Sequence, residues 1–100
     1  MEKGKPHYQL AAIQTQVAAI GIATFTQTAR LNSLMMGLTA DQALAVVAGL
    51  NSAVFFKSMT TNNDHRVWQD VYHTPCPNGK IAYIKVTLQA GAVVIQFKEK

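Results

Sequence analysis

The sequence predicts one α+β domain in which N-terminal helices pack on one face of a mostly antiparallel C-terminal sheet. Most of this prediction rests on the period of the apolar residues, which changes from 3.6 to 2 residues at Val54. The chain has 100 residues, the length of a single domain. Hydrophobic residues make up 49% of it, enough for one core. We therefore expect residues 1–100 to form a single domain.

A first helix is predicted between Pro6 and Gly21. Proline can only precede a helix or lie in its first turn, and glycine is a frequent residue just after a helix ends. Four apolar residues at helical spacing form the stripe that we expect to be buried: Leu10, Ile13, Val17 and Ile20.

A short strand and a second helix are predicted next. Ile22–Phe25 is short and rich in residues that favour strands. Thr28–Met36 has helical spacing and ends before Gly37. The residues that we expect to face the core from this helix are Leu31, Leu34, Met35 and Met36.

A third helix is predicted to begin at a capping box. The Thr39 side chain can accept a hydrogen bond from the amide of Gln42, while the Gln42 side chain reaches back to the amide of Thr39. Gly49 marks the end of this helix. Its core-facing residues are predicted to be Leu44, Val47 and Ala48.

Strands are predicted in the second half, where apolar and polar residues alternate. They cover Val54–Thr61, Arg66–Tyr72, Ala82–Gln89 and Val93–Lys98. Turn signals separate them at Asn62–Asp64, Thr74–Gly79 and Ala90–Gly91. If the helices cover one face of this sheet, the other face can stay open to solvent. The open face would carry Tyr83, Lys85, Thr87, Gln96 and Lys98.

Charge is concentrated in the second half of the chain. The net charge is +4, and between Pro6 and Phe56 the only charged residues are Arg30 and Asp41. From Lys57 onward there are six Lys or Arg residues against three Asp or Glu residues. This asymmetry suits a polyanionic partner such as a nucleic acid, although a surface that serves solubility alone would give the same balance.

The sequence shows neither a membrane-spanning segment nor a secretion signal. It has no run of 18 uncharged apolar residues, and its N-terminus does not resemble a signal peptide. The single cysteine, Cys76, cannot form an intramolecular disulfide. These observations predict a cytoplasmic protein without a membrane segment.

The chemically active residues favour a mechanism without a metal or another cofactor. The five carboxylates do not pair at helix or strand spacing, and one cysteine with three scattered histidines does not form a zinc motif. Acid–base chemistry by His, Lys, Tyr and Gln remains. Cleavage of RNA fits this set, because the 2′-hydroxyl of RNA supplies the nucleophile and the protein needs only to orient it, move protons and stabilise charge.

The predicted hairpin between Phe55 and Tyr72 offers a geometric test. If Asn62–Asp64 is a three-residue loop, Thr61 lies opposite His65 and Lys57 lies opposite Gln69. Opposed residues share one face, with Cβ atoms about 4.5–5.5 Å apart. A different loop length would change the pairing.

Several motifs resemble one family of toxins. They are Phe55–Thr61 (FFKSMTT), Asp64-His65, Trp68–Tyr72 (WQDVY), Met1–Lys3 with Pro6-His7, and Phe97–Lys100 (FKEK). Together they resemble the motility quorum-sensing regulator (MqsR) toxins over essentially the whole chain. The resemblance implies a RelE-like toxin fold and a ribosome-independent endoribonuclease that cleaves mRNA at short GC-containing sites without a metal. It also implies a type II toxin–antitoxin pair, in which a cognate DNA-binding antitoxin blocks the toxin.

The resemblance also assigns roles to residues. Catalytic roles fall on Lys57, Gln69, Tyr83 and His7, and Lys85, Arg66 and Lys98 are expected to bind RNA. Each of these residues also has an ordinary structural explanation, as a surface lysine, a polar strand residue, a sheet-edge tyrosine or a terminal histidine. We expect Trp68 in the core, and only structural roles for His65, His73 and Cys76.

Two other functions fit the sequence. The chain could be a non-catalytic RNA-binding or regulatory module, which would bind RNA in a salt-dependent way without cutting it. It could also be a protein-interaction partner without RNA affinity, because its helical half carries so few charges.

Overall fold

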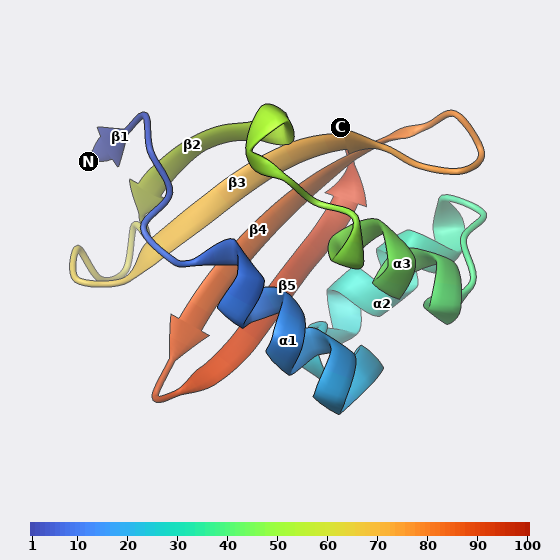
Figure 1. The fold of residues 1–100 in the computed structure, drawn as a ribbon, viewed down its shortest axis with the longest axis horizontal. Helices are drawn as coiled ribbons and strands as arrows, with labels where there is room; N and C mark the ends of the chain where they lie inside the picture. Colours follow the sequence, from blue (N-terminus) through green and yellow to red (C-terminus); the bar gives the residue numbers. More distant parts are fainter.

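The computed structural model describes all residues, 1–100, and confirms the predicted α+β class. Three α-helices and two short 3₁₀ helices lie on one side of a five-stranded sheet (Figure 1). The helical elements are α1 (Leu10–Ile20), η1 (Gly21–Thr24), α2 (Gln27–Met35), α3 (Ala40–Ala48) and η2 (Ser52–Val54). The strands are β1 (Glu2–Lys3), β2 (Phe55–Thr60), β3 (Trp68–Pro75), β4 (Ile81–Gln89) and β5 (Ala92–Glu99).

The sheet is an antiparallel meander in the order β1-β2-β3-β4-β5. Sequence periodicity did not predict β1, because two residues are too few to show an alternating pattern. This short strand pairs Glu2 with Met59 and Lys3 with Ser58. The N-terminus therefore lies along the outer edge of β2 (Figure 1).

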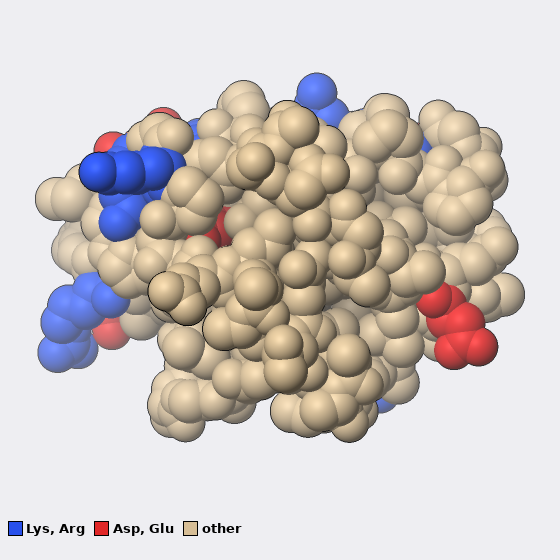
Figure 2. All heavy atoms as spheres, viewed as in Figure 1, with Lys and Arg blue, Asp and Glu red and all other residues tan.

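The hydrophobic core lies between the helices and the face of the sheet that they cover. Side chains alternate across a strand, so every second residue of β3, β4 and β5 points into this core. Its largest fully buried members are Tyr72, Ile84, Ile95 and Phe97, each at most 2% exposed. Seen from the helix side, the surface of the molecule is almost free of charged groups, which gather at its margins (Figure 2).

The capping box of α3 is confirmed by both of its hydrogen bonds. The Gln42 amide donates to Thr39 Oγ1 at 3.1 Å, and the Thr39 amide donates to Gln42 Oε1 at 2.9 Å. The predicted core face of this helix is only partly right. Val47 is buried, but Leu44 is half-buried and Ala48 is exposed. The buried stripe instead comprises Ala43, Val46 and Val47.

The second helix differs more from its prediction. The expected core residues Leu31, Leu34 and Met35 are 55%, 61% and 82% exposed, and only Met36 among those predicted is buried. The residues that α2 turns inward are Ala29 and Ser33. These small side chains let the helix approach β5 closely, and the Asn32 side chain donates to the Phe97 carbonyl at 3.0 Å.

The short strand predicted over Ile22–Phe25 is also wrong. Residues Gly21–Thr24 form a 3₁₀ turn, in which the Thr24 hydroxyl donates to the Gly21 carbonyl at 2.9 Å. Within the predicted strand only Phe25 pairs with the sheet, through a single parallel bridge to Ile95. The positive φ of Gly21 (82°) turns the chain out of α1 and makes this path possible.

The register of the β2–β3 hairpin is not the predicted one. Lys57 lies opposite Val71, and Gln69 lies opposite Met59. The turn is longer than three residues, because Thr61 still pairs with Val67 through a 2.9 Å backbone hydrogen bond. Lys57 and Gln69 nevertheless share one face of the sheet, as diagonal neighbours rather than an opposed pair.

No single helix is long and apolar enough to cross a bilayer. By length and composition alone, α2 and α3 together could form a membrane span, but the two helices are bent by 103° relative to each other.

Candidate active site

The face of the sheet away from the helices presents polar side chains in rows, because antiparallel partners on one face lie side by side. The first row runs across the strands from Lys57 through Val71 and Lys85 to Gln96. Val71 in the middle of this row is completely buried. Two lysines therefore flank a buried apolar side chain.

A second row lies beside the first and contains three aromatic rings. His73 lies opposite Tyr83, and Tyr83 lies opposite Lys98. The Phe56 ring stacks on His73, with centroids 4.3 Å apart, and the His73 and Tyr83 centroids are 5.1 Å apart. The Lys98 Nζ atom is 5.0 Å from the centroid of Tyr83, in the range of a cation–π contact.

Gln69 lies on the same face of the sheet. It is separated from the second row by the first row, which contains Lys57 and Lys85 and is called the lysine row. It is two residues from Val71 along β3, so its side chain points to the same side of the sheet. Its residue is only 8% exposed, and Thr87 on the neighbouring strand is 4% exposed. Gln69 is therefore a nearly buried amide on the open face, the kind of polar group that can help to position a substrate.

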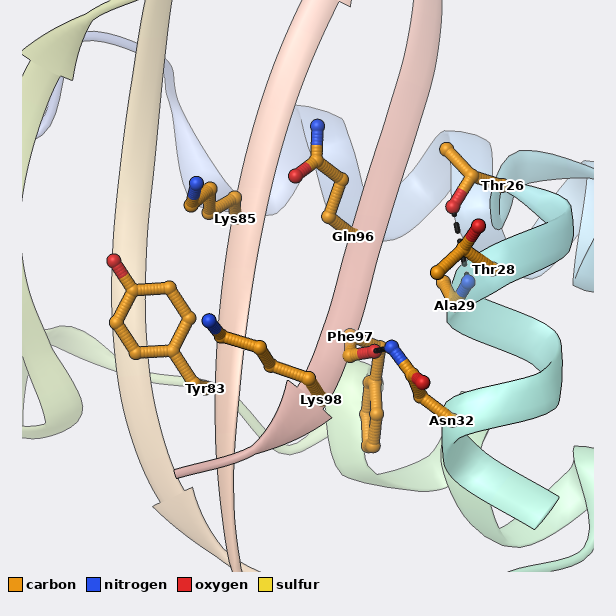
Figure 3. A pocket seen from close by; sticks show the side chains of 9 residues that line it. All are labelled: Thr26, Thr28, Ala29, Asn32, Tyr83, Lys85, Gln96, Phe97 and Lys98. Atoms are coloured by element: carbon orange, nitrogen blue, oxygen red, sulfur yellow. Dashed lines mark hydrogen bonds between the residues drawn. The ribbon is translucent and has the colours of Figure 1, made fainter. Parts of the chain in front are cut away.

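A groove of about 390 Å³ borders this face, between β4, β5 and the beginning of α2. Figure 3 shows Tyr83, Lys85, Gln96 and Lys98 on the sheet side of this groove. The helix side is formed by Thr26, Thr28, Ala29 and Asn32. Thr26 also caps α2, because its side chain accepts a 3.0 Å hydrogen bond from the Ala29 amide. The groove combines cations, an aromatic ring and hydroxyl groups, which suits a phosphate-bearing ligand.

Lys57 is held by an acidic partner from the N-terminal strand. Its Nζ atom lies 2.9 Å from Glu2 Oε2. The hydrogen bond to Glu2 raises the pKa of Lys57 above its usual value, and the hydrogen bond to Lys57 lowers the pKa of Glu2. Lys57 is therefore kept in its charged form.

Lys85 is shifted in the opposite direction. Partial burial of its ammonium group, together with repulsion from Lys98 and Lys57, lowers the pKa of Lys85 below its usual value. Its Nζ atom is 5.8 Å from the Tyr83 ring centroid. The pKa values of two lysines of one row are thus shifted in opposite directions by their surroundings.

His7 is not brought to this face. Its ring stacks on Trp68, with centroids 5.2 Å apart, and Trp68 points away from Gln69 because the two residues are adjacent in β3. Lys3 Nζ lies 2.9 Å from His7 Nδ1 and 4.2 Å from the Trp68 ring centroid. Trp68 itself was expected in the core but is half-buried beneath this N-terminal segment.

A buried carboxylate that the sequence did not single out fixes this segment. Asp70 is 1% exposed and accepts hydrogen bonds from the amides of His7 and Tyr8 and from the Ser58 hydroxyl, at 2.7–3.0 Å. No spacing signal links an acid in a strand to amides more than sixty residues away. Asp70 is thus a structural anchor on the covered side of the sheet.

Arg66 also lies apart from the rows. Its side chain is 89% exposed at the β2–β3 turn and pairs with Asp64 at 3.1 Å. Of the seven residues singled out from the sequence, the structure gathers five on the open face: Lys57, Gln69, Tyr83, Lys85 and Lys98.

Phe56, His73 and Glu2 lie at this site although the sequence did not mark them. Phe56 looked like an ordinary strand residue, and His73 like a strand end. The alternation of β3 and β4 was a usable signal for His73, because it lies on the same face as Val71. No group of three or more His, Cys, Asp or Glu side chains is placed to hold a metal ion.

Comparison with known proteins confirms the resemblance that the motifs predicted. Residues 5–99 match the family described as "Motility quorum-sensing regulator, toxin of MqsA". The chain is also 40% identical to the "mRNA interferase toxin MqsR" of Escherichia coli strain K12, over 100 residues that cover the whole of both chains.

Proposed function

The chain belongs to the motility quorum-sensing regulator family of mRNA interferase toxins, and we propose that it cuts single-stranded RNA by attack of the RNA's own 2′-hydroxyl on the adjacent phosphate. The observation that supports this most directly is the open face, where three lysines share one side of the sheet with Tyr83, Gln69 and the buried Val71. The reaction needs no metal ion and no ribosome. As the resemblance implies, its sites are short and contain G and C.

The chemistry requires two proton transfers and stabilisation of one extra negative charge. A base removes the proton of the 2′-hydroxyl, whose oxygen forms a bond to phosphorus. The bond from phosphorus to the 5′-oxygen breaks, and an acid protonates that oxygen. The products are a 2′,3′-cyclic phosphate and a free 5′-hydroxyl. DNA, which lacks the 2′-hydroxyl, is not cut.

The lysines divide these tasks according to their surroundings. Lys57, kept charged by Glu2, stabilises the negative charge of the transition state. Lys98 lies beside Tyr83 in the second row, with its Nζ atom 5.0 Å from the ring centroid, and binds the phosphate backbone. Lys85, whose pKa is lowered, is the better suited to exchange a proton with the reacting oxygens.

The remaining residues position the substrate. The Gln69 amide can orient the 2′-hydroxyl or a phosphate oxygen, and the Tyr83 hydroxyl can donate to a phosphate oxygen. His7 and Arg66 lie away from the scissile phosphate in this arrangement. We therefore assign them contacts with longer RNA rather than proton transfer in the cleavage step.

A cognate antitoxin of the MqsA type is the second proposed partner, and the cytoplasm is the proposed location. The family description names the toxin by this partner. The nearly uncharged helix side of the molecule supports a protein contact (Figure 2). Co-purification of the toxin with the product of a neighbouring gene that encodes a DNA-binding protein would test it.

The cleavage reaction is tested with a single-stranded RNA oligonucleotide in excess EDTA. We expect cutting at full rate, and products that end in a 2′,3′-cyclic phosphate. The same oligonucleotide with 2′-O-methyl groups should stay intact, because its nucleophile is blocked.

Two results would contradict the proposal. Cleavage that appears only with added Mg²⁺ would mean that a metal, not the lysine row, activates the reaction. Salt-dependent binding of RNA that is never cut would favour the alternative of a non-catalytic RNA-binding module.

A further inference from the structure

A β-bulge in β2 determines which way Phe56 points. Phe55 lies opposite Tyr72, while Lys57 lies opposite the preceding residue of β3, Val71. Two steps along β2 therefore match one step along β3, and Phe56 is the extra residue. In a regular strand Phe56 and Lys57 would point to opposite faces. The bulge brings both to the open face, where the Lys57 Nζ atom lies 5.6 Å from the Phe56 ring centroid.

Phe56 is a large apolar side chain left in solvent. It is 53% exposed, although its neighbour Phe55 is packed against Tyr72 with centroids 5.5 Å apart. Its inner surface is covered by His73, at 4.3 Å and an interplanar angle of 22°. Behind His73 lies Tyr83. One side of the Phe56 ring is thus supported, and the rest of its surface is accessible.

We propose that Phe56 is a nucleobase-stacking residue, on which an unpaired base next to the cleaved phosphate lies while Lys57 binds that phosphate. This rests on the proposed function, because it assigns the base-binding part of the same RNA site. Bases of single-stranded RNA stack on exposed aromatic rings, and neighbouring cations hold the backbone. The bulge supplies this pairing of ring and cation, at a place where bulges often re-aim side chains for function.

Three variants of Phe56 separate stacking from mere hydrophobic contact. Phe56→Ala removes the ring, Phe56→Leu keeps apolar volume without a π face, and Phe56→Trp enlarges the π face. The matched control is Leu31→Ala, which truncates an equally exposed apolar residue (55%) on α2. Since both side chains are more than half exposed, none of these changes should prevent folding.

Binding is measured with a 2′-O-methyl RNA oligonucleotide of mixed sequence, so that no cleavage interferes. We expect Phe56→Ala and Phe56→Leu to weaken binding by about 5- to 150-fold, the range for the loss of one stacked base. Phe56→Trp and Leu31→Ala should bind like the wild type. With 2-aminopurine in the oligonucleotide, fluorescence should be quenched by the wild type and by Phe56→Trp but not by Phe56→Leu.

The salt dependence of binding distinguishes the ring from the lysine. Phe56→Ala should leave the slope of log Kd against log salt unchanged, because no phosphate contact is lost. Lys57→Ala should reduce that slope by about 0.7, the value for one phosphate contact on a single strand.

Equal binding by wild type, Phe56→Ala and Phe56→Leu, with equal 2-aminopurine quenching, would overturn the inference. Loss of binding in Phe56→Ala but not in Phe56→Leu would do the same, because apolar contact would then suffice. These results are independent of the cleavage test. A wild type that never cuts RNA in EDTA but stacks bases on Phe56 would remove the proposed reaction and leave the stacking site.

Discussion

The two faces of the sheet are built from alternate residues of the same strands. On the covered face Tyr72, Ile84 and Phe97 are at most 2% exposed and pack beneath the helices. On the open face their neighbours Lys85 and Lys98 reach toward solvent. A shift of one residue in any strand would exchange the two sets. The same alternation that specifies the core therefore also assembles the candidate site.

The open face is not simply a solvated surface. Val71 is completely buried there, and Gln69 and Thr87 are less than a tenth exposed. Long lysine side chains can cover such a floor with their apolar stems while their ammonium groups stay in water. The difference from the covered face is thus in what lies on top of the strands. Folding depends on the helices above one face, and the proposed RNA cleavage depends on the cations above the other.

Ile84→Ala should have the largest effect, because it opens a cavity in the covered face. Ile84 is 0% exposed, and truncations of this kind cost about 2–5 kcal/mol of unfolding free energy. Urea denaturation should show this as a lower midpoint. Its neighbour Lys85, changed to Ala, should shift the unfolding free energy by less than about 1 kcal/mol. Equal losses of unfolding free energy in both variants would mean that the open face contributes as much to stability as the covered face.

Lys57→Ala makes the converse test on the open face. Loss of one group that stabilises the transition-state charge typically lowers a rate by about 100- to 1000-fold. We expect a loss of this size in the single-turnover rate of RNA cleavage. The unfolding free energy should change little, because the pair with Glu2 is exposed.

Lys5→Ala is the matched control for this variant. It removes the same charge from an exposed position between β1 and α1, outside the rows of the open face. Its cleavage rate should stay within about threefold of the wild type, since only long-range attraction of RNA is affected. A loss as large as that of Lys57→Ala would attribute the effect to net charge.

Exchange of each lysine for arginine compares the two proposed roles on one row. Arginine keeps the positive charge but does not release its proton. Lys57→Arg should therefore retain most of the cleavage rate. Lys85→Arg should lose about 100-fold or more of the rate while still binding RNA. The measurement is single-turnover cleavage at saturating RNA, with binding to the 2′-O-methyl oligonucleotide as control. Full activity of Lys85→Arg would mean that Lys85 supplies only positive charge and does not transfer a proton.

Periodicity predicted the class of the fold and most of the open face, because both depend on which residues alternate. Tyr83, Lys85, Gln96 and Lys98 were assigned to one face from their spacing alone, and the structure places them there. The capping box of α3 was equally visible, since it depends on two residues three positions apart.

Features that depend on tertiary contact were not visible in the sequence. The predicted β2–β3 register was wrong because the turn extends beyond its predicted residues, Asn62–Asp64. Hydrogen bonds between the Thr61 hydroxyl and the backbone of Asp64 stabilise this longer turn. The bulge at Phe56 left no trace in a run of strand-forming residues. The inner face of α2 was missed because it is made by Ala29 and Ser33, whose small size, not hydrophobicity, lets the helix approach β5.

The smallest predicted effect concerns the histidine between the aromatic rings of the open face. Burial, and to a lesser degree the charge of Lys100, lowers the pKa of His73 below its usual value. Its Nε2 atom is buried without a hydrogen-bond partner. Because the unfolded chain binds this proton more tightly than the folded one, stability should fall as the pH drops through the unfolded value of about 6.5.

His73→Phe keeps a ring between Phe56 and Tyr83 but cannot be protonated. The unfolding free energy of both proteins is measured by urea denaturation at pH 7.5 and pH 5. Relative to the variant, the wild type should lose less than about 1 kcal/mol of unfolding free energy as the pH falls between these values. His7 and His65 are unchanged between the two proteins, so their contributions cancel in this difference. A difference that stays constant with pH would mean that protonated His73 is tolerated in the folded state. Base stacking on Phe56 should survive the substitution, because it requires the support of a ring and not of a charge.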